Sequence, residues 1–334
     1  MAADARGLGE SAVGGAKRSR RARAQGFRMS STPMRPGRVV IAGASGLIGS
    51  ALAAALEREG RTVVRLVRRA AVGPGEVTWD PAAGRLDAGA LEGAEAVVNL
   101  AGENVGSRLW TAARRDAIWR SRVEATRTLV MAMQRAQRKP EVFLSASAVG
   151  FYGDRGEEVL AEDAAVGHGF LPEVCLAWET HAEGAARVGV RTALLRFGVV
   201  LASAGGALAR LRPLFRLGLG GRLGHGRQWM SWIGIDDAVG ALGHALAQPA
   251  CRGPLNVVAP QPATNAEFTA TLARVLGRAA WLPVPAFALR AALGRMADEM
   301  LLASARVVPR RLEETGYTFR TPSLEAALRA AAGR

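Results

Sequence analysis

A short apolar segment that runs into closely spaced glycines constrains the fold more than any other part of this sequence. Residues 38–42 read Arg-Val-Val-Ile-Ala, and Gly43, Gly46 and Gly49 follow. The compact apolar run is typical of a buried strand, and the apolar spacing after Gly46 is that of a helix. Small residues at such a turn let a phosphate approach the N–H groups of a helix N-terminus. The segment therefore predicts a nucleotide-binding strand, turn and helix.

The same segment has a second interpretation. Residues 39–56 carry no charge and follow an arginine-rich leader, which taken alone indicates a signal peptide or a short membrane span. Three glycines, two serines and a change of periodicity within the run argue against a span. We expect residues 1–37 to be a disordered basic extension, with a basic targeting arm as the alternative.

The charge is distributed unevenly. The chain of 334 residues has 44 basic and 29 acidic side chains, a net charge of +15, and residues 1–37 alone hold eight basic residues against Asp4 and Glu10. The remainder lacks a dense basic run interleaved with aromatics, so we expect neither a nucleic-acid nor a membrane partner. We expect a monomer or a homodimer.

Cysteine and histidine usage points to a reducing compartment without a metal site. Cys175 and Cys251 cannot form a disulfide framework and lack C-x-x-C spacing. The four histidines show no metal-ligand spacing. We therefore expect a cytoplasmic protein that binds no metal.

Strands and helices alternate along residues 38–250. Strands are predicted at Thr62–Val67, Ala96–Leu100, Glu141–Ala146 and Leu194–Leu201, and a long helix between Trp110 and Arg135. This alternation predicts an α/β fold, a Rossmann-like doubly wound parallel sheet, whose ligands lie beyond the carboxyl ends of the strands. For residues 251–334 we predict a small, mainly helical C-terminal cap on the substrate side, with helices at Thr264–Leu276 and Phe287–Leu293.

The end of the second strand suggests which dinucleotide is bound. An acidic residue at this place would bind a ribose 2′-hydroxyl, but Arg68 and Arg69 stand there instead. Guanidinium groups can clamp a 2′-phosphate, so NADP(H) is favoured over NAD(H). The alternative is two solvated arginines. The predicted cofactor-binding residues are Gly43, Ala44, Ser45, Gly46, Leu47, Ile48, Gly49, Arg68, Arg69, Leu100, Ala101 and Gly102.

Several motifs together resemble a known family. They are Ile41–Gly49, Asn99–Glu103, Ser121-Arg122 with Thr126, Ser145–Asp154, Leu194–Leu201, Gly218–Gly221 with Gly226–Gln228, Trp232–Asp237, Pro309–Leu312, Gly316–Phe319 and Leu324-Glu325. The chain resembles the extended short-chain dehydrogenase/reductases, and among them the atypical NAD-dependent epimerase/dehydratase branch with a C-terminal domain of unknown function. The resemblance implies that backbone at Val199 and Val200 contacts the nicotinamide.

The resemblance also implies a catalytic set of Asn, Ser, Tyr and Lys, of which this chain keeps only the serine, Ser147. Arg122, Cys175 and Glu179 stand at the other three positions. Exchanging Lys for Glu inverts the charge that would lower a phenol pKa.

Two other side chains can be considered for proton transfer. Tyr152 is either a proton donor or an aromatic that lines the pocket. Glu179 is either a carboxylate base or, the interpretation we favour, the ion-pair partner of Arg122. The candidate catalytic residues are thus Ser147, Tyr152 and Glu179.

The substrate side is less defined. Glycines are dense in residues 215–228, which suits a mobile loop, and Arg227 in it favours an anionic small molecule. We assign Glu103 and Arg227 to substrate binding, and Asp236 and Asp237 to a helix cap and first turn. The predicted function is a redox or epimerase-type step without the usual Tyr-Lys pair. The alternative is a non-catalytic NADP(H) sensor or partner-binding protein.

Overall fold

The computed structural model describes residues 37–333. The predicted disordered extension lies outside the described residues, apart from Gly37. A seven-stranded sheet in the order β11-β7-β5-β4-β1-β2-β3 forms the centre, and every pairing in it is parallel. Its strands are β1 (Arg38–Ala42), β2 (Thr62–Val67), β3 (Glu76–Thr78), β4 (Ala96–Asn99), β5 (Val142–Ala148), β7 (Arg191–Phe197) and β11 (Gly253–Val257).

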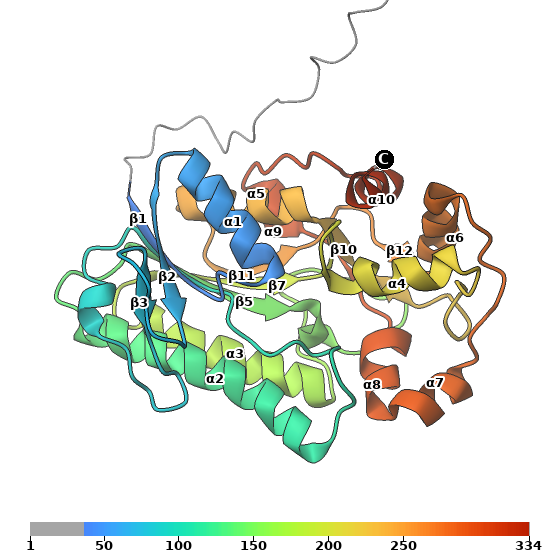
Figure 1. The fold of residues 1–334 in the computed structure, drawn as a ribbon, viewed down its shortest axis with the longest axis horizontal. Coiled ribbons are helices and arrows are strands. Elements are labelled where there is room, and N and C mark those ends of the chain that lie inside the picture. Colours follow the sequence, from blue (N-terminus) through green and yellow to red (C-terminus); the bar gives the residue numbers. More distant parts are fainter. Residues whose placement is uncertain (1–36, 334) are drawn as a thin grey trace, which may run out of the picture.

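Helices cover both faces of this sheet (Figure 1). On one face α1 (Leu47–Arg58) and α5 (Ile235–Ala247) pack against Val39 and Ile41 of β1. On the other face α2 (Ala112–Arg135) and α3 (Phe170–Ala186) share a core with Val40. A strand buried on both faces needs apolar residues at successive positions, which explains the uninterrupted run in β1. The predicted Rossmann-like doubly wound sheet is confirmed.

The strand order reverses beside β1. The chain passes from β1 to β2 and β3 on one side, then returns to β4, β5, β7 and β11 on the other. The register pairs Ala42 with Asn99 and Asn99 with Ser145, so the carboxyl ends of these strands meet at one edge. A crevice opens at such a reversal, and ligands of doubly wound sheets bind there.

The helical region on the substrate side has its own apolar core, around Phe268, Leu272 and Leu328. Helices are present close to the two predicted ranges, 264–276 and 287–293. Thr264 caps the first of them, α6, and forms a capping box with Glu267. The elements of this region are α4 (Gly206–Arg216), α6 (Asn265–Leu276), α7 (Ala286–Leu293), α8 (Arg295–Ala297), a π-helix (Asp298–Leu302) and α10 (Leu324–Ala332). By contrast, α9 (Arg310–Glu314) packs on the large sheet, where Leu312 is part of the core.

Short strand pairs connect this region to the large sheet. They are β8 (Val199–Leu201) with β10 (Trp232–Gly234), β9 (Trp229–Met230) with β12 (Ala263–Thr264), and β6 (Val159–Leu160) with β13 (Arg306–Val307). β11 lies beyond the expected domain boundary at residue 250, yet it is the edge strand of the large sheet. The C-terminal part therefore completes the Rossmann-like sheet as well as covering it.

Two local expectations need correction. The strand predicted over 194–201 is interrupted at Gly198, where an added Cβ would lie 2.5 Å from the carbonyl oxygen of Ser231. The N-cap of α5 is Gly234, so neither Asp236 nor Asp237 caps the helix and both lie in its first turn. Asp237 is buried and instead accepts hydrogen bonds from the backbone N–H groups of Arg320 and Thr321.

None of the helices in residues 37–333 is long and apolar enough to cross a bilayer.

Candidate functional site

The turn between β1 and α1 has the close packing that only glycine allows. Gly43 has a φ of +80°, and a Cβ there would lie 2.6 Å from the carbonyl oxygen of Leu100. A Cβ on Gly49 would lie 2.2 Å from the carbonyl oxygen of Gly43. Both glycines are therefore required by the geometry of the turn, which holds the end of β1 against the end of β4.

The N-terminus of α1 is open to an anion. Its N-cap, Gly46, makes no side-chain capping bond, and the first turn contains no acidic residue. Free N–H groups and the partial positive charge of the helix end therefore face the carboxyl edge of the sheet. These features fit the pyrophosphate of a dinucleotide.

A cleft of about 1390 Å³ lies along this edge. Ten of the predicted ligand-binding residues line it: Gly43, Ala44, Ser45, Gly46, Arg68, Arg69, Leu100, Ala101, Gly102 and Glu103. Leu47, Ile48 and Gly49 lie in α1 beside the cleft, and Val199 and Val200 lie in β8, outside its lining.

One wall of the cleft was not predicted. It comes from the end of β3 and the turns after it, and from the N-terminal half of α2: Thr78, Trp79, Asp80, Pro81, Ala117, Arg120 and Ser121. Trp79-Asp80-Pro81 follows a strand that ends at the same edge as β1 and β2. That signal was available, but β3 has only three residues and is easily overlooked.

The two arginines after β2 have different surroundings. Arg69 makes a bidentate ion pair with Glu76, with N···O distances of 2.7 and 2.6 Å. Its guanidinium hydrogen bonds hold the pKa of Glu76 down at about 2. Arg68 is exposed and has no ion-pair partner within residues 37–333. Arg68 is therefore the side chain that remains available to a 2′-phosphate.

Ser147 belongs to a buried, charge-balanced group. Its hydroxyl donates to Glu179 at 2.6 Å, and Arg196 of β7 donates to both carboxylate oxygens of Glu179 at 2.8 Å. All three side chains are at most 5% exposed. The pKa of Arg196 is raised, because the hydrogen bond and charge of Glu179 outweigh the effect of burial. The predicted Glu179–Arg122 ion pair is wrong, since Arg196 occupies that carboxylate.

Arg122 belongs to α2 and lies between the loop after β4 and Trp178 of α3. Its guanidinium donates to the carbonyl oxygens of Ile118 and Glu103 at 3.0 and 3.1 Å and stacks over the ring of Trp178. Burial lowers its pKa. A Cβ on Gly102 would lie 3.2 Å from the guanidinium carbon, so Arg122 supports the backbone that lines the cleft.

Tyr152 is fully buried and its hydroxyl is occupied. It accepts a hydrogen bond from Arg196 at 2.9 Å and donates to Asn256 at 2.7 Å. Burial raises the pKa of this phenol. Tyr152 does not line the cleft, and the structure places it behind Arg196, in the protein interior.

Cys175, at the position where the resemblance places a tyrosine, is also buried. Burial and the carboxylate of Glu179 raise the pKa of its thiol to about 11. The thiol is therefore neutral near pH 7, so this side chain is not an activated nucleophile. Among residues 37–333 no cluster of His, Cys, Asp and Glu could hold a metal ion.

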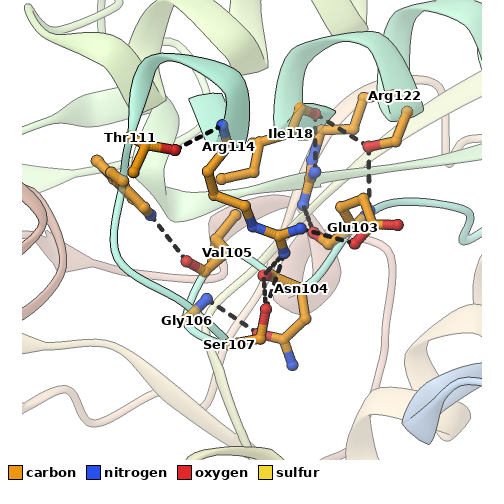
Figure 2. A network of polar contacts seen from close by, with 11 residues as sticks. Glu103, Asn104, Val105, Gly106, Ser107, Thr111, Arg114, Ile118 and Arg122 are labelled. Carbon is orange, nitrogen blue, oxygen red and sulfur yellow. Dashed lines mark hydrogen bonds and ion pairs between the residues drawn. The ribbon is translucent and has the colours of Figure 1, made fainter. Parts of the chain in front are cut away.

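A polar loop follows β4, and its Glu103 lies in the cleft lining. Figure 2 shows the contacts that hold this loop. Arg114 holds it by donating to the carboxylate of Glu103 at 3.0 Å and to Ser107 at 2.8 Å. The backbone N–H of Glu103 donates to Ser121. Glu103 is thus fixed by α2 at the mouth of the cleft, whereas Arg227 is an exposed residue of the glycine-rich loop, away from the cleft lining.

Sequence comparisons match residues 39–258 to the NAD dependent epimerase/dehydratase family and residues 284–331 to a domain of unknown function, DUF1731. The chain belongs to the NAD dependent epimerase/dehydratase family. An epimerase family protein of Mycobacterium bovis is 46% identical over 290 residues, 87% of this chain and 96% of that protein.

Solved structures of family members have the same fold. The crystal structure of human epimerase family protein SDR39U1 with NADPH has a TM-score of 0.81 and 37% identity, and covers 89% of this chain and 99% of that one. A nucleoside-diphosphate sugar epimerase from Corynebacterium glutamicum has a TM-score of 0.75 and 37% identity, and covers 90% of this chain and 59% of that one. The chain and these relatives therefore share the same fold.

Proposed function

We propose that this protein is an NADP(H)-dependent enzyme that carries out a redox or epimerase-type step on a small anionic molecule, without a tyrosine–lysine pair. The observation that carries the proposal is the convergence of an uncapped helix, a glycine turn and Arg68 on one cleft. The human relative, which is 37% identical, was solved with NADPH, and this supports the choice of cofactor.

The chain's own residues would bind the cofactor at both ends. The N–H groups of α1 and the Gly43–Gly46 backbone would hold the pyrophosphate, and Arg68 the 2′-phosphate. When bound, the nicotinamide supplies or accepts a hydride. Glu103, held by Arg114, would contact the substrate. Arg227, which lies outside the cleft lining, would bind a negative group of a substrate that extends beyond the cleft.

Ser147 and Glu179 would handle the proton. Because the hydroxyl of Ser147 already donates to Glu179, its oxygen can accept a hydrogen bond from a substrate hydroxyl. A proton leaving the substrate oxygen would pass to Ser147, while the serine proton passes to Glu179. Arg196 would keep Glu179 in place and balance its charge. Neither of the two tyrosines in the sequence takes part, since Tyr152 is enclosed and the Tyr317 hydroxyl donates to Asp237.

A second candidate function is NADP(H) sensing without chemistry. The hydrogen bond from Ser147 to Glu179 favours this function, because a serine whose proton is held by a carboxylate is a poor hydrogen-bond donor to a substrate carbonyl. A sensor would bind NADPH in the same cleft, so cofactor binding alone does not separate the two functions.

Hydride transfer separates them. NADPH tritiated at C4 of the nicotinamide would be incubated with the protein and with pools of carbonyl compounds or sugar nucleotides. The enzyme proposal expects label to leave the cofactor in at least one pool, and Ser147→Ala to abolish the transfer while NADPH binding is retained. Tight NADPH binding with no transfer in any pool would support the sensor instead.

A further inference from the structure

Most of the exposed large apolar side chains lie on two short segments of the helical region. Of the ten such side chains in residues 37–333, six are on residues 214–219 and 281–287. Trp281 is 81% exposed, Phe287 74% and Leu217 73%. The others in this group are Leu214, Leu219 and Leu282. We call these six side chains the apolar patch.

The two segments are joined through their backbones. Leu223 forms a bridge with Val284, the N–H of Val284 donates to Arg222 at 2.9 Å, and the N–H of Gly224 donates to Val284 at 2.8 Å. The patch therefore extends from the end of α4 to the start of α7. Figure 1 places both helices at the end of the molecule away from β3.

The chain segments around the patch are rich in arginine, and three of these arginines, Arg274, Arg290 and Arg295, pair with Glu325, Asp298 and Glu299 outside the two segments. Residues 203–235 contain five arginines and residues 268–297 contain four, and neither range contains an acidic residue. Within the described chain, Arg216, Arg222, Arg227 and Arg278 have no ion-pair partner. An exposed apolar group bordered by unpaired arginines fits an occupant that is both anionic and apolar.

This charge disfavours two possible occupants. A second copy packed by two-fold symmetry would bring the same arginines face to face. Residues 1–36 of the chain carry eight basic side chains against two acidic ones, so they are repelled by the same arginines. The patch side chains are about half to four-fifths exposed.

Although the composition predicts no membrane partner, we propose that the apolar patch and its arginines form a peripheral docking surface for a lipid bilayer with anionic headgroups. Trp281, Phe287 and the leucines would enter the interfacial layer, and Arg216 and Arg278 would contact lipid phosphates. Binding would be reversible and weakened by salt, because screening shortens the range of the arginine charges. The proposal does not depend on the proposed function, since no residue of the patch lines the cleft.

Vesicle flotation tests the surface. The full chain would be mixed with vesicles of phosphatidylcholine alone or of equal parts phosphatidylcholine and phosphatidylglycerol. We expect binding to the mixed vesicles only, at least a tenfold loss in Trp281→Ser with Phe287→Ser, and no loss in the matched control Val72→Ser, whose side chain is 84% exposed elsewhere. NADPH binding would verify that each variant is folded.

A charge-matched pair tests the arginines. Arg216→Gln with Arg278→Gln should weaken binding to mixed vesicles, whereas Arg187→Gln with Arg252→Gln, at the amino edge of the sheet, should not. Absence of binding to mixed vesicles, or binding that survives loss of the patch, would overturn the proposal. So would a wild-type dimer that Trp281→Ser with Phe287→Ser converts to a monomer, since the occupant would then be a second copy.

Discussion

At the scale of single residues, neighbouring arginines of equal charge have different roles because one of them is already paired. Arg69 is held by Glu76, and Arg68 is not paired within the described chain. We therefore expect Arg68→Ala to weaken NADPH binding about 10- to 100-fold, the value of charged hydrogen bonds worth ~1.5–3 kcal/mol, and to leave NADH binding unchanged. Titration of each cofactor against the protein measures both affinities.

Arg69→Ala is the matched control for this prediction. It removes the same charge one residue away, and we expect it to change the NADPH to NADH preference less than Arg68→Ala does. If both substitutions leave the preference unchanged, Arg68 is merely solvated and the 2′-phosphate is bound elsewhere.

A second residue-scale prediction concerns the thiol of Cys175. Its pKa is raised from 9.0 to about 11 in the folded protein, so folding favours the neutral thiol. The contribution of the neutral thiol to the free energy of unfolding is fully present below pH 9 and is lost as the pH rises toward 11. At ~1.4 kcal/mol for each unit of pKa difference, the loss amounts to roughly 2–3 kcal/mol. Urea unfolding between pH 8 and about pH 11 should therefore show a steeper loss of stability in the wild type than in Cys175→Ala.

The sequence located Ser147 and Glu179 but assigned Glu179 the wrong partner. Arg122 follows Ser121 and Arg196 follows Leu195, and nothing in the sequence indicates that Arg196 points inward from a central strand. Burial of a charge in β7 depends on a carboxylate supplied by α3, 17 residues earlier. A pairing between two elements is visible only once their packing is known.

At the scale of elements, the Glu179–Arg196 pair fastens α3 to β7. Because both side chains are buried, removing one leaves an unpaired charge, and we expect Arg196→Met or Glu179→Gln to lower the free energy of unfolding by ~3–5 kcal/mol. The exposed pair Arg120–Asp116 on α2 is the control, and Arg120→Met should cost no more than about 1 kcal/mol. Urea unfolding curves measure both, and equal costs for the two pairs would contradict this assignment.

The elements themselves were largely predictable, and the interruption that was missed depends on a contact between distant segments. The β2 strand has the predicted bounds, Thr62–Val67, because its β-branched and apolar residues are interrupted only by Arg65. The interruption at Gly198 was missed, since the carbonyl of Ser231 that requires it comes from a distant segment. The glycine turn at Gly43 was predictable because the strand before it and the helix after it are adjacent in the sequence.

At the scale of the whole molecule, the C-terminal region is bound to the Rossmann-like sheet by polar contacts that carry no periodic signal. The side chain of Asn256 in β11 accepts a hydrogen bond from the Tyr152 hydroxyl and donates one to the carbonyl oxygen of Val308. The carboxylate of Asp237 in α5 accepts hydrogen bonds from the backbone N–H groups of Arg320 and Thr321. The sequence therefore predicted a separate cap where the chain in fact returns to the sheet. Stability of the cleft and of the C-terminal region should accordingly be coupled.

Truncation from the two ends tests this coupling. The first strand begins at Arg38 and the family match begins at residue 39, so we expect removal of residues 1–36 to leave both the NADPH affinity and the melting temperature unchanged. Removal of residues 322–334 takes away α10, whose buried Leu328 packs with Phe268 and Leu272 of α6. That deletion exposes an apolar face and should lower the melting temperature by several degrees.

Calorimetry with and without NADPH measures both truncations. A saturating cofactor stabilises only the folded state, by ~2.7 kcal/mol at 100 times its dissociation constant. The shift should persist in the chain lacking residues 1–36. If that chain instead melts earlier or loses the NADPH shift, the basic extension contributes to the folded unit. If the chain lacking α10 melts like the wild type, the C-terminal helix is not coupled to the core that the cleft depends on.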